Sequence, residues 1–228
     1  RMADGSLVPL PNKHVDTGMG FERLCMAIQG KQSIYDTDVF QGTIQYIAAK
    51  SGKKYGDEKW ADIAMRVISD HIRAIAFCIA DGQLPSNNKA GYVIRRILRR
   101  AVRYGYTYLD FKEPFLHLLI PGLAQQFKGV FDELISQEAF VAKVIYEEEV
   151  SFLRTLSSGL VRLDKLMEDC SGKVLSGDDV FELNDTYGFP VDLTALIARE
   201  KGLDIDEPGF NAALKAQKER SRKDAGAS

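Results

Sequence analysis

Five arginines within one short stretch are the residues best suited to bind a charged ligand. Arg95, Arg99 and Arg103 recur at every fourth position, so on a helix they form one row along its surface. Arg96 and Arg100 form a neighbouring row, and the two rows together make a broad cationic face. Concentrated positive charge of this kind is typical of a surface that binds a phosphate backbone.

The surrounding sequence does not neutralise this charge. Residues 82–109 contain no Asp or Glu, so Lys89 and the five arginines place six positive charges in a chain whose net charge is −2. A solvated basic face, or one paired with acids elsewhere in the fold, is the alternative to a polyanion site. From the width of a helix face we expect roughly two or three of the arginines to have no acidic partner.

The second chemically informative segment is VDTGMGFERL, residues 15–24. Gly18 and Gly20 allow a ligand to approach the backbone closely, and Arg23 on the following helical turn could bind a phosphate. Asp16 could hold an ammonium group. A structural strand-to-helix turn explains the same pattern equally well, so the spacing leaves both interpretations open.

Asp185 is the third candidate, at the start of the segment DTYGFPVDLT. A carboxylate beside a basic surface is repelled by phosphate, but it can accept a hydrogen bond from the amino group of a base. Spacing alone favours a simpler interpretation, in which Gly188 ends one helix and Asp192 begins the next.

Composition narrows the classes of function. The 228-residue chain is 45% hydrophobic and 27% charged, as ordinary globular proteins are. No apolar run is long enough to span a membrane, and the N-terminus lacks the apolar region of a secretory signal. Three dispersed cysteines indicate a reducing, cytoplasmic setting. The equally dispersed histidines predict no metal site within these residues.

Helical periodicity predicts a mainly α fold with a small β element only near the N-terminus. The clearest helix is residues 61–80, where Ile68, Ile72 and Ile75 belong to one broad apolar stripe. Residues 1–15 are interpreted as loop and a short strand. Further helices are expected over residues 21–29, 37–51, 91–105, 113–127, 131–167, 176–188, 190–200 and 208–223. The one at 113–127 is expected to be interrupted at Pro121 and Gly122, and the acidic run 147–149 to lie on a helix surface.

Taken together, these segments resemble the alanyl-tRNA synthetases, a family of class II aminoacyl-tRNA synthetases. The matching segments are VDTGMGFERL, YDTDVF, SDHIRAIAFCIADG, PSNNKAGYVIRRILRRAVRYG and DTYGFPVDLT, in this order, and the resemblance covers essentially the whole chain. It implies the C-terminal edge of a class II catalytic domain, with motif 3 and a short β remnant, at residues 1–30. A helical tRNA-recognition domain is implied at residues 31–228.

The resemblance also implies roles in substrate binding. Arg23 is expected to contact the γ-phosphate of ATP, and Asp16 to hold the amino group of alanine. Gly18 and Gly20 are expected to shape the small amino-acid pocket. The implied activity is that of an alanine–tRNA ligase, which uses ATP and Mg²⁺.

For RNA, the resemblance implies that Asn87 and Asp185 flank a G·U pair in the acceptor stem of tRNA-Ala. Ala90 stands where the family often has Arg, and Asn184 where Tyr is common. These departures predict one fewer loop or phosphate contact and looser packing near Asp185. The residues expected to bind acceptor-stem phosphates are Arg95, Arg96, Arg99, Arg100 and Arg103.

We expect the chain to be a fragment of a longer protein. Motifs 1 and 2 of the catalytic domain and a zinc-bearing editing domain are expected outside this sequence, so the fragment alone is expected to be inactive. A helical RNA-binding module without ligase activity, or a helical scaffold, is the alternative. The segment VDTGMGFER argues against the first, and the concentrated positive charge argues against the second.

Overall fold

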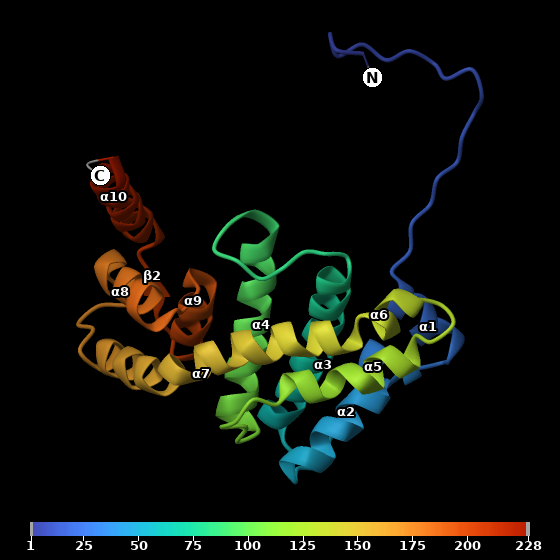
Figure 1. Ribbon diagram of the computed structural model, residues 1–228, viewed down its shortest axis with the longest axis horizontal. Coiled ribbons are helices and arrows are strands. Elements are labelled where there is room, and N and C mark those ends of the chain that lie inside the picture. The colour runs from blue at the N-terminus through green and yellow to red at the C-terminus, as the bar shows by residue number, and fades with distance from the viewer. Residues whose placement is uncertain (1, 227–228) are drawn as a thin grey trace. The chain divides into compact units, whose positions relative to one another are not determined.

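A computed structural model of the protein, which describes residues 2–226, consists mainly of helices (Figure 1). The predicted mainly α fold is therefore confirmed. Contacts along the chain divide it into two compact units, Arg1–Gln41 and Gly42–Ser228. The domain boundary predicted at residue 30 stays a prediction.

The first unit contains little regular structure. It comprises α1 (Phe21–Ile28), the 3-10 helix η1 (Ile34–Asp36) and the beginning of α2 (Asp38–Ser51). No residue of α1 is buried. Residues 2–20 form neither helix nor strand and are exposed, so the strand expected there is not found in that range. A strand needs a partner for its backbone hydrogen bonds, and residues 2–20 have no partner strand within them.

Helices α3 (Lys59–Ala80) and α4 (Lys89–Tyr108) pack against each other in the second unit. Ile72 of α3 and Leu98 of α4 are completely buried between the helices of this unit. The arginine-rich segment is thus an amphipathic helix, as its spacing predicts: Leu98 lies on the apolar face and the arginines lie on the other.

The segment predicted as one helix over residues 131–167 forms two. α6 (Asp132–Ser136) and α7 (Glu138–Glu168) are separated at Gln137, whose side-chain amide donates to the carbonyl oxygen of Ala80 at 2.8 Å. Figure 1 shows α7 running past α3 and α4 and on to α8, and all three helices contact it.

The helix predicted over residues 113–127, with an interruption at Pro121 and Gly122, is divided before those residues. The 3-10 helix η2 (Leu116–Leu119) leads directly into α5 (Ile120–Gln126). Pro121 lies in the first turn of α5 rather than interrupting it, because the N–H group that proline lacks has no partner at that position of a helix.

Three helices and a pair of short strands complete the second unit. Ser176 caps α8 by accepting a hydrogen bond from the N–H group of Asp179 at 3.1 Å, and Gly188 ends it with a φ of 69°. The helix predicted over residues 176–188 is thus confirmed, and Gly188 ends it as predicted. The strands were not predicted, because each contributes only two residues and no alternating pattern. The elements are α8 (Gly177–Tyr187), α9 (Val191–Glu200), α10 (Glu207–Gly226), and the parallel strands β1 (Val174–Leu175) and β2 (Asp204–Ile205).

Helices α8 and α10 touch backbone to backbone near their first residues. A Cβ atom added to Gly177 would lie 2.3 Å from the carbonyl carbon of Gly209. Backbone atoms cannot move aside as a flexible side chain can, so glycine at this contact sets the distance between the two helices.

Glu149 departs from the expectation that the acidic run lies on a helix surface. Its side chain is 3% exposed and accepts hydrogen bonds from the N–H groups of Phe115 at 2.9 Å and Leu116 at 3.0 Å. Burial raises the pKa of Glu149 to about 7, and the two hydrogen bonds oppose this effect. Glu147 is exposed, as predicted, and pairs with Lys143.

The buried Glu149 carboxyl makes the stability of the fold depend on pH. Its pKa is about 7 in the folded state against an ordinary value of 4.5, so the folded state binds more protons between these values and stability falls as pH rises through them. At about 1.4 kcal/mol per pH unit, the loss amounts to about 3 kcal/mol. We expect Glu149→Gln to abolish this component of the slope in denaturant titrations from pH 4.5 to 7.

Two comparisons isolate the contribution of Glu149. His117 lies 4.0 Å from the Glu149 carboxylate, and burial lowers the pKa of this histidine. Its titration therefore makes the free energy of unfolding rise with pH below 6.5, in wild type and in Glu149→Gln alike. The difference between wild type and Glu149→Gln therefore reports the carboxyl itself. Glu147→Gln is the matched control, and a Glu149→Gln slope equal to that of wild type would contradict the assignment.

Candidate functional site

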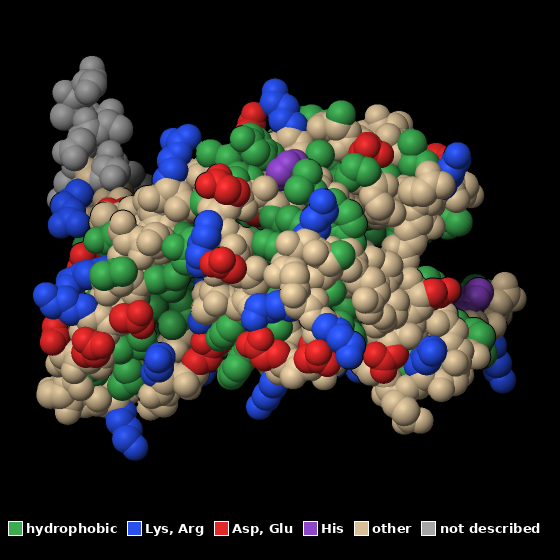
Figure 2. All heavy atoms as spheres, turned by 90° about the horizontal axis from the view of Figure 1, so that it is seen from below, with side chains coloured by type: hydrophobic (Ala, Val, Ile, Leu, Met, Phe, Trp, Pro, Cys, Tyr) green, Lys and Arg blue, Asp and Glu red, His purple; other side chains and the backbone are tan. Residues whose placement is uncertain are grey.

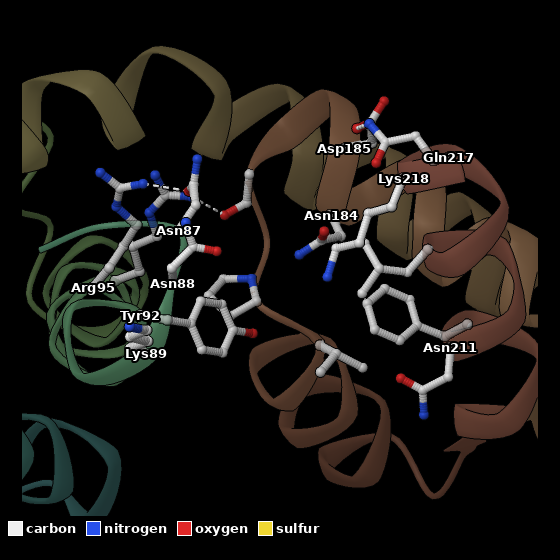
Figure 3. Close-up of a pocket in the computed structure, with 16 residues that line it drawn as sticks. Asn87, Asn88, Lys89, Tyr92, Arg95, Asn184, Asp185, Asn211, Gln217 and Lys218 are labelled. Atoms are coloured by element: carbon white, nitrogen blue, oxygen red, sulfur yellow. Dashed lines mark hydrogen bonds between the residues drawn. The ribbon is translucent and has the colours of Figure 1, made fainter. Parts of the chain in front are cut away.

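A groove of about 830 Å³ lies between the beginning of α4 and helices α8 and α10 (Figure 3). Asn87 and Arg95 lie on one side of it, and Asp185 and Lys218 lie on the other. The structure thus brings into one groove the two residues that the sequence predicts to flank a base pair. All the elements that form it belong to the second unit.

The loop that carries Asn87 folds back onto the first turn of α4. The N–H group of Ser86 donates to the carbonyl oxygen of Gly91 at 3.0 Å. A Cβ atom on Gly91 would lie 2.3 Å from Ser86 Oγ, so only glycine permits this close approach. Lys89 between them has a φ of 50°, a left-handed conformation that is strained for a residue with a side chain.

Arg95 connects this loop to α7. Its guanidinium donates to Asn87 Oδ1 at 2.5 Å and to both carboxylate oxygens of Glu148, at 2.5 and 3.1 Å. The carbonyl oxygen of the Asn87 side chain is therefore occupied, and its amide nitrogen remains to donate to a ligand. In this position Arg95 orients Asn87 rather than extending into solvent.

The opposite side of the groove is built on the last turn of α8. Gln217 of α10 donates its side-chain amide to Asp185 Oδ1 at 3.1 Å. The neighbouring Asn184 donates to the carbonyl oxygen of Phe189 at 2.8 Å, and Phe189 is completely buried. The sequence predicted looser packing here, whereas this hydrogen bond joins the end of α8 to the turn that follows it.

Arg99 lies at the base of the groove, against the turn after α8. Its guanidinium donates to the carbonyl oxygen of Gly188, and it lies 3.8 Å from the carboxylate of Glu148. A Cβ atom on Gly188 would lie 2.6 Å from Arg99 Nη1. Burial lowers the pKa of Arg99, and the charge of Glu148 opposes this effect. Gly188 therefore both ends α8 and makes room for the guanidinium.

The remaining arginines of α4 pair with the two ends of α9. Arg96 and Arg100 share the carboxylate of Asp192, at 3.6 and 2.5 Å. Arg103 donates to both oxygens of Glu200, at 3.0 and 2.7 Å, and its side chain is only 4% exposed. Burial lowers the pKa of Arg103, but the hydrogen bonds and charge of Glu200 raise it above its ordinary value.

All five arginines of the cationic face thus have an acidic partner within the described residues. The expectation that two or three would lack one is wrong, because the acids come from α7 and α9, which lie far along the chain from α4. Five arginines meet only three carboxylates, so the face keeps a positive balance by count. On the face drawn in Figure 2, basic and acidic side chains are likewise interspersed.

Comparison with known proteins identifies the family. Residues 1–228 match the family described as tRNA synthetases class II (A). This chain belongs to that family. An alanine–tRNA ligase of Cytophaga hutchinsonii is 63% identical over 228 residues, which are 99% of this chain and 26% of the relative. Alanine–tRNA ligases of Parabacteroides distasonis and Bacteroides thetaiotaomicron are 63% and 60% identical over 225 residues. The chain spans about a quarter of the length of these relatives, 26% in each case.

The residues of this synthetase chain that were predicted to bind ATP and alanine form no pocket within the described part of the first unit. Asp16, Gly18, Gly20 and Arg23 are all exposed, and no heavy atom beyond its two chain neighbours lies within 4 Å of a Cβ atom built on Gly18. Gly20 precedes α1, which places Arg23 on its first turn, as predicted. A guanidinium there suits a phosphate chemically, but residues 2–41 do not enclose one.

The contribution of α10 to the groove was not predicted. Its sequence contains no recognisable motif, and only the three- and four-residue spacing of its lining residues on one helix face could have indicated them. Those residues are Phe210, Asn211, Leu214, Gln217 and Lys218.

Among the residues that the structure describes, no group of three or more His, Cys, Asp or Glu side chains is arranged to hold a metal ion. No helix in the same part of the chain has the length and hydropathy needed to cross a membrane.

We expect Glu148→Ala to lower the free energy of unfolding by about 2 kcal/mol, since the largely buried Arg95 and Arg99 lose their shared carboxylate. Chemical denaturation measures this change. Glu147→Ala is the matched control, an exposed glutamate at the adjacent position of α7, and it should cost less than about 0.5 kcal/mol. Equal effects of the two substitutions would show that the arginines do not depend on Glu148.

Proposed function

We propose that this chain is the tRNA-binding part of an alanine–tRNA ligase and that its groove receives the acceptor stem of tRNA-Ala. The observation that carries the proposal is the groove itself, which sets Asn87 and Asp185 on opposite sides, next to Arg95 and Arg99. The names of relatives that are 60–63% identical to the chain support the choice of alanine.

The charge of the groove suits a polyanion. Asp185 is the one carboxylate among the residues that line the groove. Glu148, which is not one of them, is shared by Arg95 and Arg99. Positive charge that remains after internal pairing is available to phosphate oxygens, and each phosphate contact makes binding more sensitive to salt. The lining cations are Lys89, Arg95, Arg99 and Lys218.

The polar groups left over by internal contacts can recognise a base pair. The amide nitrogen of Asn87 is a hydrogen-bond donor, and Oδ2 of Asp185 is an acceptor. A G·U pair offers both complements, because the guanine amino group and a uracil carbonyl oxygen are unpaired in it. Tyr92 also lines the groove, and its hydroxyl group is a neutral donor at pH 7 with the ordinary pKa of tyrosine, which burial raises further.

Of the five arginines, the geometry favours Arg95 and Arg99 for contact with RNA. Both line the groove while sharing one carboxylate. Arg96 and Arg100 are about one third exposed, with side-chain exposures of 37% and 32%, and could contact a phosphate outside it. Arg103, at 4% exposure, serves mainly to hold α9 against α4.

The proposed reaction attaches alanine to the 3′ end of tRNA, and ATP with Mg²⁺ supplies the activating chemistry. Within this chain, the Arg23 guanidinium would bind a phosphate of ATP and the Asp16 carboxylate would hold the ammonium group of alanine, next to Gly18 and Gly20. We also infer a cytoplasmic location for the protein. The three cysteines of the chain are free thiols, which is typical of proteins in a reducing compartment.

We expect this chain alone to catalyse no alanine-dependent exchange between ATP and pyrophosphate. The reason is that Asp16, Gly18 and Arg23 are exposed and unenclosed, whereas such chemistry depends on groups held in place in a site that excludes water. A standard exchange assay measures the reaction, and turnover above the rate without alanine would show that the chain completes its own pocket.

The test of RNA recognition is binding of the chain to an acceptor-stem hairpin that contains G·U, compared with the same hairpin carrying G·C. We expect tighter binding to G·U. We also expect the logarithm of the affinity to fall with the logarithm of salt concentration, with a slope of about −2 to −4 for the few cations that line the groove. Equal affinity for both hairpins would overturn the base-pair assignment.

Substitutions locate the preference within the groove. Asn87→Ala and Asp185→Asn should each reduce the preference for G·U by roughly tenfold, as the loss of one base contact does. Asp178→Asn is the matched control, because it makes the same change at an exposed position of the first turn of α8. It should leave the ratio of the two affinities unchanged.

A further inference from the structure

We infer that Gln217 is a positioning residue for Asp185, and that α10 is the wall of the groove that makes its recognition of a base pair selective. The inference rests on the proposed function, since it concerns the selectivity of that same site. It assigns a role to a helix in which the sequence contains no motif.

Asp185 needs a partner to hold it in one orientation. It is exposed on the last turn of α8, and within the described residues its side chain has a single hydrogen bond, from Gln217 Nε2 to Oδ1 at 3.1 Å. An exposed carboxylate otherwise samples several rotamers, and ordering them on binding would cost free energy. The amide occupies one oxygen and leaves the other for a ligand. Figure 3 shows the two side chains next to each other on the same side of the groove.

The Gln217–Asp185 hydrogen bond resembles the Arg95–Asn87 hydrogen bond on the other side of the groove. There, Arg95 occupies the carbonyl oxygen of Asn87 and leaves its amide nitrogen free. Each of the two recognising side chains is therefore held through one polar atom and offers the other. A preformed donor and a preformed acceptor at fixed separation discriminate between base pairs better than mobile ones, because less entropy is lost on binding.

Helix α10 can hold Gln217 in place because its own start is fixed. The N–H group of Gly209 donates to Asp206 Oδ1 at 3.0 Å, and Gly209 touches Gly177 of α8 through the backbone. Phe210, one residue further on, is 4% exposed and also lines the groove. The contact between Gly177 and Gly209 fixes the distance between α8 and α10. Asp185 and Gln217 lie about two helical turns beyond this contact, each on its own helix, so their separation is also set.

Gln217 is expected to contribute little to the free energy of unfolding. It is partly exposed, and its hydrogen-bond partner is an exposed carboxylate. Substitutions at such surface positions usually change stability very little. A change at Gln217 should therefore alter the preference between base pairs while leaving the folded state unchanged, which a purely structural residue would not do.

The experiment measures the affinities of the chain for the G·U and G·C hairpins in Gln217→Ala and Gln217→Glu, together with the unfolding temperature of each variant. In Gln217→Ala we expect the ratio of the two affinities to fall by roughly fivefold to tenfold, as the loss of one ordinary hydrogen bond predicts. The affinity for the G·C hairpin and the unfolding temperature should stay as in wild type.

Gln217→Glu tests the direction of the hydrogen bond. The shape of the side chain is kept, but at pH 7 the new carboxylate cannot donate and repels Asp185, so the ratio should fall at least as far as in Gln217→Ala. Lowering the pH toward about 4 should restore part of the ratio, since a carboxyl next to another carboxylate is more readily protonated and can then donate. Gln125→Glu is the matched control, an exposed amide on α5 outside the groove, and its ratio should not change.

The outcomes separate the two proposals. If wild type binds both hairpins equally, the proposed function fails. If wild type prefers G·U and Gln217→Ala keeps the full preference, the proposed function stands and the positioning role is wrong. A parallel loss of affinity for both hairpins with a lower unfolding temperature would also overturn the positioning role, because it would show that Gln217 is a structural residue.

Discussion

The pairing of the cationic face of α4 with acids from other helices is the interaction on which the rest of the second unit depends. Glu148 of α7 and Asp192 and Glu200 at the two ends of α9 meet the arginines of one helix. Charged groups that are taken out of water are tolerated only when they are paired and hydrogen-bonded. The polar face of α4 therefore fixes where α7 and α9 lie, much as its apolar face fixes α3.

The groove follows from this pairing. Arg99 contacts the turn that ends α8, and Arg95 contacts the loop that begins α4, so the two walls are joined through neighbouring positions of one helix. Glycines set the closest approaches: Gly91 on one side, Gly188 at the base and Gly177 at the contact with α10. Internal contacts use part of the polar side chains of Asn87, Arg99 and Asp185, and their remaining polar atoms are available to a ligand.

This arrangement changes how the basic helix is understood. A face of five unpaired arginines would bind any polyanion, with affinity governed mainly by salt. In the structure the arginines are partly neutralised, and Arg95 in the groove also holds Asn87, which is proposed to contact a base. Under the proposed function, Arg95 would thus contribute both positive charge and the orientation of a recognising side chain.

Much of the fold could be predicted from the sequence, because its signals are local. Periodicity marks α3 and α4, Ser176 and Gly188 bound α8, and the spacing of the arginines places them on one helix face. The short strands and the break at Gln137 could not be predicted, since they depend on partners elsewhere in the chain. Asn87 and Asp185 were identified as candidates through family motifs, whereas Gln217 belongs to no motif.

The sequence by itself determined which residues can carry charge and hydrogen bonds, and on which helix face they lie. Only the tertiary structure decided which of them remain available to a ligand. Glu148, Asp192 and Glu200 meet α4 from far along the chain, and Glu149 is buried while its neighbour Glu147 is exposed. The physical reason is that pairing and burial depend on distances in space, which residue types and helical spacing alone do not specify.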